Sequence, residues 1–157
     1  MEQRINVFEE APNAMKPLFG FGAYLNKSSL EKQLLHLLYY RVSQMNGCAY
    51  CLDMHSKDLR AGGETEQRLY MLDAWREVAI YSDREKAALG WAEAVTILKD
   101  KNVPDEVYTT ASELFTAEEL VDLTIAVIAI NSYNRINIAF RKQAGSYQPG
   151  QYKAAVA

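Results

Sequence analysis

The chain has 157 residues, of which 49% are hydrophobic and 24% charged, and a formal net charge of -3. This length predicts a single domain with a substantial buried core, and the composition is typical of a folded globular protein. The negative net charge excludes broad binding to nucleic acid or to anionic membranes, because both need clustered Lys and Arg side chains.

The first residues do not have the pattern of a secretory signal, because residues 1–4 are followed by acidic residues and not by an apolar run. The longest apolar segment, residues 123–130, is too short to span a bilayer. We therefore expect a cytoplasmic protein with no membrane partner. In that reducing compartment, two cysteines indicate redox or metal chemistry rather than a structural disulfide.

The chain begins with residues 1–27, which we expect to form an N-terminal arm, a short helix or loop over the core. Residues 28–31 fit a capping box with Ser28 as the N-cap, and they predict a helix that runs to about Met45. Asn46 and Gly47 end this helix, because both residues tolerate left-handed backbone geometry.

Five more helices are predicted from start and stop signals in the rest of the chain. Two of them open with capping boxes, at residues 82–85 and at residues 116–119. The predicted helices cover residues 48–62, 65–74, 82 to before 102, 104–115 and 116–143. No strand pattern accompanies them, so the predicted fold class is all-α.

The last predicted helix is apolar nearly all round between residues 123 and 130, which predicts enclosure on every side. In a chain this short, we expect a second subunit to supply part of that enclosure. Residues 146–157 are expected to form a loose or partner-bound tail. The predicted organisation is one domain over residues 1–157, with its helical core in residues 28–145.

The stretch that carries chemistry is residues 47–55, which holds both cysteines of the chain and one of its two histidines. On a helix, Cys51 and His55 form an i, i+4 pair with Cβ atoms about 5–6 Å apart, and Cys48 shares that face. Unpaired N–H groups of a first helical turn and a nearby imidazole both favour a thiolate. The pattern predicts a dithiol that can hold a thiolate, pass a proton to His55 and close a disulfide. Cys48, at the mouth of the turn, is expected to lie nearer the surface, where thiol exchange takes place.

The same stretch leaves two other interpretations open. A structural zinc site needs four ligands, and two thiols with one imidazole would have to recruit a carboxylate. Two buried and inert cysteines are the second alternative. We expect redox chemistry, with no bound metal and no resident cofactor.

Outside this stretch, Trp75 and Trp91 are interpreted as core residues, and Glu93 as part of a solvated helix face with Glu85 and Lys86. A polar group late in the last helix is expected to satisfy buried polar atoms at a helix crossing or subunit contact. Its members are Asn131, Asn134, Arg135 and Asn137.

Residues 41–55, with their C-x-x-C-x-x-x-H pattern, closely resemble the AhpD-like alkylhydroperoxidase branch of the carboxymuconolactone decarboxylase superfamily. The resemblance covers roughly residues 30–141. It implies an all-helical bundle, assembled as a homotrimer or homohexamer, that reduces a peroxide with two thiols and is re-reduced by an external thiol. It also implies that Cys51 attacks the peroxide, that Cys48 closes the disulfide and that His55 relays protons.

One position departs from the pattern of that family. The family usually has a glutamate twelve residues before the first cysteine, and this chain has His36 there. An imidazole with a pKa near 6.5 suits proton transfer, but it cannot supply a fixed negative charge. We expect His36 to join the relay, with altered or weaker peroxidase activity; a solvent-exposed His36 is the alternative.

Two other functions remain open at this point. A dithiol redox sensor or electron-transfer protein would cycle its disulfide without consuming peroxide. A lactone decarboxylase of the same superfamily would not require two thiols.

Overall fold

The structure is a computed structural model that describes residues 2–152, and these residues are helical with no strand among them. The all-α class predicted from the sequence is therefore confirmed. The elements are α1 (Val7–Glu10), α2 (Pro12–Leu25), α3 (Lys32–Asn46), α4 (Ala49–Ala61), α5 (Glu66–Met71), the 3-10 helix η1 (Leu72–Glu77), α6 (Asp83–Ile97), the 3-10 helix η2 (Lys99–Lys101), α7 (Asp105–Leu114) and α8 (Ala117–Phe140).

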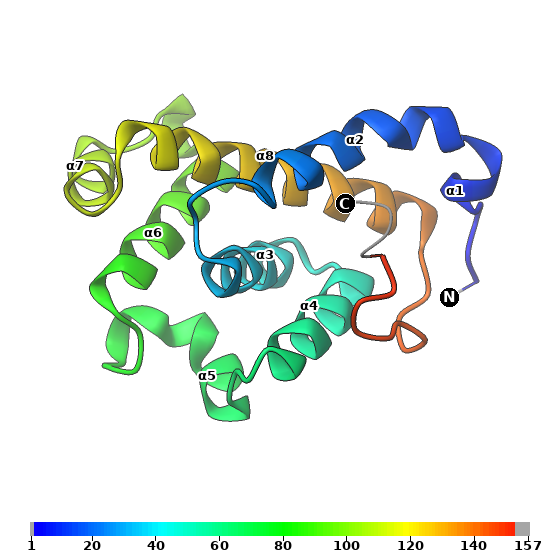
Figure 1. Ribbon diagram of the computed structural model, residues 1–157, viewed down its shortest axis with the longest axis horizontal. Coiled ribbons are helices and arrows are strands. Elements are labelled where there is room, and N and C mark those ends of the chain that lie inside the picture. The colour runs from blue at the N-terminus through cyan, green and yellow to red at the C-terminus, as the bar shows by residue number, and fades with distance from the viewer. Residues whose placement is uncertain (1, 153–157) are drawn as a thin grey trace.

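Helix α3 is the centre of the bundle, and it packs against α4, α6 and α8. Figure 1 shows it nearly end-on, with α8 crossing above it and α4 and α6 on its two sides. A helix with neighbours on several sides must be apolar over more than one stripe. Accordingly α3 buries Leu34, Leu35, Leu37, Leu38 and Val42.

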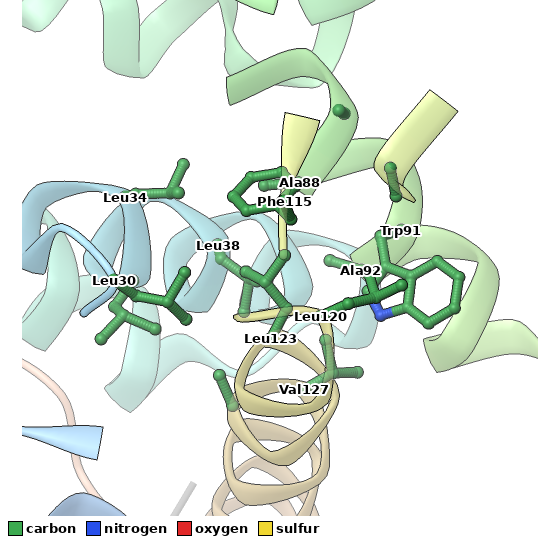
Figure 2. Packing of buried hydrophobic residues seen from close by; sticks show 14 of the residues in the cluster. Leu30, Leu34, Leu38, Ala88, Trp91, Ala92, Phe115, Leu120, Leu123 and Val127 are labelled. Carbon is green, nitrogen blue, oxygen red and sulfur yellow. The ribbon is translucent and has the colours of Figure 1, made fainter. Parts of the chain in front are cut away.

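The main core lies where α3, α6 and α8 meet (Figure 2). Leu38 of α3, Ala88 of α6 and Leu123 of α8 are completely buried there. Each fully buried leucine stabilises the fold by about 1.5–3 kcal/mol relative to an exposed one. Trp91 is also buried in this cluster, and Trp75 is buried in a second, smaller cluster, so both tryptophans are core residues as predicted.

Two of the three predicted capping boxes are confirmed. Ser82 and Glu85 cap α6 reciprocally, and Thr116 and Glu119 do the same for α8. The predicted box at Ser28 is wrong, because α3 begins four residues later, at Lys32. The Ser28 hydroxyl donates instead to the Leu25 carbonyl at 2.8 Å and so closes the end of α2.

Helix α8 ends at Phe140, three residues before the predicted end, because Arg141 adopts a left-handed conformation with φ of 55°. One face of α8 is not covered by residues 2–152: Val121 is 59% exposed and Ile128 is 43% exposed. The predicted enclosure on every side is therefore incomplete within one copy. Among residues 2–152, no helix combines the length and the apolar character needed to cross a membrane.

The chain after α8 folds back along α4, and we call residues 145–152 the C-terminal strap. Lys57 of α4 donates to the carbonyl oxygens of Gly145 and Tyr147, at 3.0 and 3.1 Å. Tyr147 is buried, and its hydroxyl donates to Asp58. The expectation of a loose tail is thus wrong for these residues, and residues 153–157 lie outside the described part of the chain.

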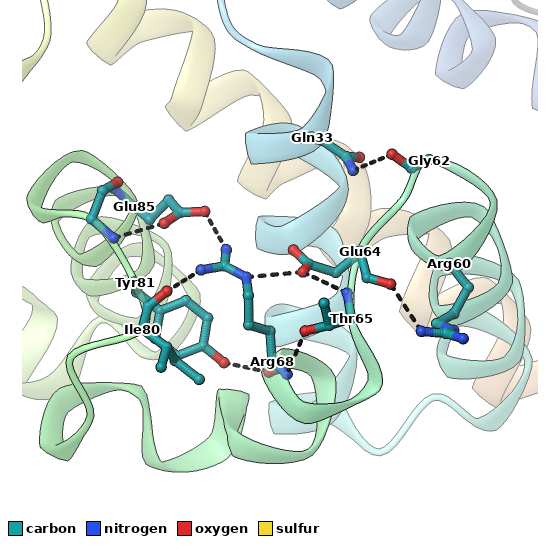
Figure 3. Close-up of polar contacts among 10 residues, drawn as sticks. Gln33, Arg60, Gly62, Glu64, Thr65, Arg68, Ile80, Tyr81 and Glu85 are labelled. Carbon is teal, nitrogen blue, oxygen red and sulfur yellow. Dashed lines mark hydrogen bonds and ion pairs between the residues drawn. The ribbon is translucent and has the colours of Figure 1, made fainter.

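Polar contacts fix the far end of α4 and the turn that follows it (Figure 3). The Gln33 side chain of α3 donates to the Gly62 carbonyl at 2.9 Å. Beyond the turn, the Arg68 guanidinium pairs with both Glu64 and Glu85, which ties α5 to α6. Helix α4 is therefore held at its end by the same helix, α3, that packs along its side.

Candidate active site

The two cysteines lie at the junction of α3 and α4. Gly47 ends α3 in a left-handed conformation with φ of 68°, which glycine adopts at little cost. Cys48 is the N-cap of α4, and Cys51 lies in the first turn of that helix. Their sulfur atoms form a disulfide, with the Cα atoms 5.3 Å apart. Backbone N–H groups at a helix start favour negative charge, so this turn suits a thiolate once the disulfide opens.

Both cysteines are buried to the same degree, with 1% of each exposed. The prediction that Cys48 lies nearer to the surface is therefore wrong for the disulfide form. The reason is that Cys48 sits at the α3–α4 junction, where its own N–H donates to the Ser43 carbonyl at 3.1 Å. This hydrogen bond draws the start of α4 back against the last turn of α3.

Asn137 of α8 reaches the cysteine turn and donates its side-chain N–H to the Cys51 Sγ at 3.3 Å. Sequence reasoning expected Asn137 to need a buried polar partner, but it did not predict that the partner is a sulfur. Nearby on α8, Asn134 donates to the Ser43 hydroxyl and accepts from Asn46, as expected of residues at a helix crossing. A donor aimed at Cys51 Sγ stabilises a thiolate there more than it stabilises a thiol.

The two histidines are brought together across the α3–α4 interface. The ring centroids of His36 and His55 are 5.8 Å apart, and Tyr39 lies 5.3 Å from His55. His36 is partly buried, and its Nδ1 is enclosed without a hydrogen-bond partner in the described part of the chain, so the alternative of a solvent-exposed histidine is wrong. The structure thus places His36 beside the predicted relay histidine.

Burial makes both imidazoles neutral at physiological pH. Desolvation, reinforced by the neighbouring His36, lowers the pKa of His55 to about 3. Desolvation also lowers the pKa of His36, against a smaller opposing effect of Asp58. A neutral His55 has a lone pair that can accept the Cys51 proton, and the thiolate so formed would raise the pKa of the imidazolium.

Asp58, one turn after His55 on α4, completes a group that sequence reasoning did not predict. Ligand atoms of His36, His55 and Asp58 all lie within 4.8 Å of one another. The signal was present in the sequence as an i, i+3 pair of His55 and Asp58, but the third member comes from α3 and depends on how the helices cross. These residue types can hold a divalent metal ion.

Arg41 anchors a buried ion-pair cluster on the other side of α3. It pairs with Glu93 of α6 and with Asp73 of η1. Trp75 and Arg76 also donate to Glu93. Burial would raise the pKa of Glu93, but hydrogen bonds from Trp75, Arg41 and Arg76 outweigh it and lower the pKa. The interpretation of Glu93 as part of a solvated face is wrong, because its side chain is only 13% exposed and pairs with Arg41 of α3. Residue spacing within α6 does not reveal a partner on another helix.

Tyr50, between the two cysteines in the chain, lines a cavity of about 350 Å³. Lys142 lies over its ring at 4.3 Å, and the hydroxyl groups of Tyr50 and Tyr152 are hydrogen-bonded at 2.7 Å. The remaining lining residues are Gln3, Asn6, Phe8, Gln143, Ser146 and Gln151. A recess with aromatic walls therefore lies next to the cysteine turn.

The sequence model of the carboxymuconolactone decarboxylase family matches residues 12–94, which is more than half of the chain. A protein of unknown function from Agrobacterium tumefaciens, described as a candidate AhpD antioxidant defence protein, has a crystal structure that superposes with a TM-score of 0.88. The two sequences are 39% identical, and the match covers 93% of this chain and 100% of that one. The chain therefore belongs to the carboxymuconolactone decarboxylase family, in its AhpD-like branch.

Other relatives extend the comparison. The uncharacterized protein YdfG of Bacillus subtilis (strain 168) is 47% identical over 146 residues, which cover 93% of this chain and 99% of YdfG. The uncharacterized protein YnjA of Escherichia coli (strain K12) is 29% identical over 113 residues, which cover 72% of this chain and 62% of YnjA. The crystal structure of a peroxidase-related protein from Ralstonia eutropha JMP134 with an AhpD core superposes with a TM-score of 0.78. The two sequences are 19% identical, and the match covers 89% of this chain and 75% of that one, which shows a common fold.

Proposed function

We propose that the protein is a thiol-dependent peroxidase that reduces organic hydroperoxides or hydrogen peroxide through a cycle of Cys48 and Cys51. The observation that carries this proposal is the disulfide at the first turn of α4, with the Asn137 N–H on the Cys51 sulfur. A sulfur placed at a helix start and contacted by a hydrogen-bond donor is suited to the thiolate state that attacks peroxides.

The cycle has three balanced steps. The Cys51 thiolate attacks one peroxide oxygen, the O–O bond breaks, and the leaving oxygen takes a proton to give an alcohol or water. The Cys51 sulfenic acid then condenses with the Cys48 thiol, releasing water and forming the disulfide. An external thiol reductant finally gives two electrons and two protons, by thiol exchange, to restore both thiols.

His55 serves this cycle as the base that takes the Cys51 proton, and His36 exchanges protons with His55 from the position of the family's glutamate. The 5.8 Å separation of the two rings supports this pairing. The cycle uses no resident cofactor, since the external thiol supplies the two electrons and the peroxide substrate accepts them. We place it in the cytoplasm, where such thiol reductants are available.

We propose further that the working unit is a homotrimer or homohexamer without nucleic-acid or membrane partners. The exposed apolar side chains of α8, with Ile128 at 43% and Val121 at 59%, support a second copy as the missing cover. The family membership of the chain supports the same assembly.

The test is a stopped-flow measurement of peroxide consumption by the fully reduced protein, with an alkyl hydroperoxide as the substrate. Without added reductant, we expect rapid consumption of one equivalent of peroxide by the unaltered protein and none above background for Cys51→Ser. Cys48→Ser should also consume one equivalent, but its sulfenic acid cannot be converted to the disulfide. After sub-stoichiometric peroxide, mass spectrometry should show the loss of two hydrogens from the Cys48–Cys51 peptide. Equal slow rates for the unaltered protein and Cys51→Ser would contradict the proposal.

A second candidate is a dithiol redox sensor or electron-transfer protein that turns over no peroxide. The observation in its favour is that His36, a side chain without a fixed negative charge, stands where the family has a glutamate. This candidate predicts a reversible Cys48–Cys51 disulfide with a defined reduction potential. It also predicts that the reduced protein consumes negligible peroxide.

A further inference from the structure

Three metal-ligating side chains converge at the α3–α4 interface, next to the disulfide but apart from it. His55 and Asp58 project from α4 one turn apart, and His36 reaches them from α3. Their ligand atoms lie within 4.8 Å of one another. The disulfide keeps both sulfurs out of this group, because a sulfur bonded to sulfur is not a thiolate ligand.

His55 provides a second, independent observation. Only 5% of it is exposed, and neither its Nδ1 nor its Nε2 has a hydrogen-bond partner among residues 2–152. The Nδ1 of His36 is enclosed in the same way. A buried polar atom without a partner costs about 1–3 kcal/mol, so the enclosed nitrogen atoms of these two neighbouring rings favour the binding of a further group.

We propose that His36, His55 and Asp58 bind a divalent transition-metal ion, with Zn²⁺ as the best match. Two imidazoles and one carboxylate are ligands that zinc takes in sites with an open fourth position for water. Mg²⁺ and Ca²⁺ prefer oxygen ligands and fit this set poorly. An ion at the centre of the three atoms would need each of them to move inward by less than about 1 Å to reach zinc distances of about 2.0–2.2 Å.

The surroundings of the three side chains support this assignment. Burial keeps both imidazoles neutral, which leaves a lone pair on each ring for the ion. The Tyr147 hydroxyl of the C-terminal strap lies 2.8 and 2.9 Å from the two Asp58 oxygens and fixes the orientation of the carboxylate. Such outer hydrogen bonds orient ligands at metal sites and strengthen binding.

The ion would regulate the cysteine chemistry, and this consequence rests on the proposed peroxidase function. A zinc-bound His55 has no free lone pair on its ligating nitrogen and carries a positive charge beside it. It therefore cannot take the Cys51 proton, and peroxide reduction should stop until the metal is removed. The expected regulation is inhibition by Zn²⁺ that a chelator reverses.

The test is calorimetric titration of the oxidised, disulfide-closed protein with Zn²⁺, together with visible absorption of the Co²⁺ form as a report on geometry. We expect one ion per chain and a Co²⁺ spectrum of a four-coordinate nitrogen and oxygen site. Asp58→Asn keeps an acceptor for the Tyr147 hydroxyl but loses the negative charge of the carboxylate. Both Asp58→Asn and His36→Gln should raise the zinc Kd at least about 100-fold. Asp53→Asn is the matched control: it is on the same helix and contacts the same strap, through Gly145, but lies outside the cluster.

Retained zinc affinity in Asp58→Asn and His36→Gln, or no binding by the unaltered protein, would overturn the assignment. If circular dichroism shows that His36→Gln does not fold, the Asp58→Asn variant still tests the metal site, because Asp58 is only partly buried. The peroxidase proposal is judged separately, because the titration uses no peroxide. A protein that binds zinc as expected but never consumes peroxide supports the metal site and contradicts the proposed peroxidase.

Discussion

Asn137 donates its side-chain N–H to the Sγ of Cys51 across 3.3 Å, which connects α8 to the first turn of α4. We predict that Asn137→Leu, which has a similar volume and no donor, slows peroxide reduction at pH 7. A hydrogen bond to a charged group contributes about 1.5–3 kcal/mol, so its loss should raise the Cys51 thiol pKa by about 1–2 units. The thiol pKa is measured by the ultraviolet absorbance of the thiolate during a pH titration of the reduced protein.

Ser132→Ala, on the same helix and away from the cysteines, is the control for this measurement. It should leave both the thiol pKa and the rate unchanged. If Asn137→Leu slows the reaction without any change in thiol pKa, the amide acts through packing and not through the sulfur.

Glu93 accepts from Arg41, Arg76 and Trp75, and its side chain is only 13% exposed. We predict that Glu93→Gln lowers the free energy of unfolding by roughly 2–4 kcal/mol, because Arg41 keeps its buried charge but loses a main partner. Chemical denaturation of the oxidised protein measures this change. Glu31→Gln removes an exposed partner of Arg84 and should cost less than about 1 kcal/mol.

The same carboxylate gives a pH dependence with a definite sign. Although burial opposes it, hydrogen bonds from Trp75 and Arg41 lower the Glu93 pKa below its ordinary value of 4.5. Its stabilising contribution is therefore complete above pH 4.5 and is lost as the pH falls through the lowered folded-state pKa. The stability difference between the unaltered protein and Glu93→Gln should be constant from pH 6 down to about pH 4.5 and should shrink as the pH falls further. A difference that stays constant below that pH would mean that Glu93 does not titrate between the two states.

Ile128 on α8 is 43% exposed, and we predict that it lies in the contact between copies of the chain. Light scattering should give a mass that is a multiple of 17.8 kDa for the unaltered protein and a smaller mass for Ile128→Asp, because a charge is costly in an apolar contact. Ile80→Asp is the matched control, since Ile80 is 42% exposed but lies between η1 and α6. A monomeric unaltered protein would remove the prediction.

The helices could be predicted because their signals are local. Thr116 with Glu119, and Ser82 with Glu85, cap helices through contacts within one turn, which residue spacing reveals directly. Ser28 shows the limit of such a signal, because the same hydroxyl can close the preceding helix as well as open the next. The spacing alone does not decide between these two hydrogen bonds.

The candidate site could be predicted only in the part that lies on one helix. Their spacing predicts that Cys48, Cys51 and His55 lie together at the start of α4, and the structure has Cys48 as the N-cap with Cys51 and His55 on the helix. The predicted exposure of Cys48 was wrong. Asn137 and Asp58 were missed as members of the site because their roles depend on the crossing of α8 and α3 with α4. Glu93 was misread for the same reason, since its partner Arg41 lies on a different helix.

Only 1% of each cysteine is exposed, so an external thiolate cannot reach the sulfur atoms of the closed disulfide directly. In the proposed peroxidase cycle, regeneration would therefore require α4 and its neighbours to separate transiently, and the rate of that local opening would set an upper limit on turnover. In the same cycle, burial would also shield a newly formed sulfenic acid from a second oxidant molecule, so a slower regeneration step would accompany protection against irreversible oxidation.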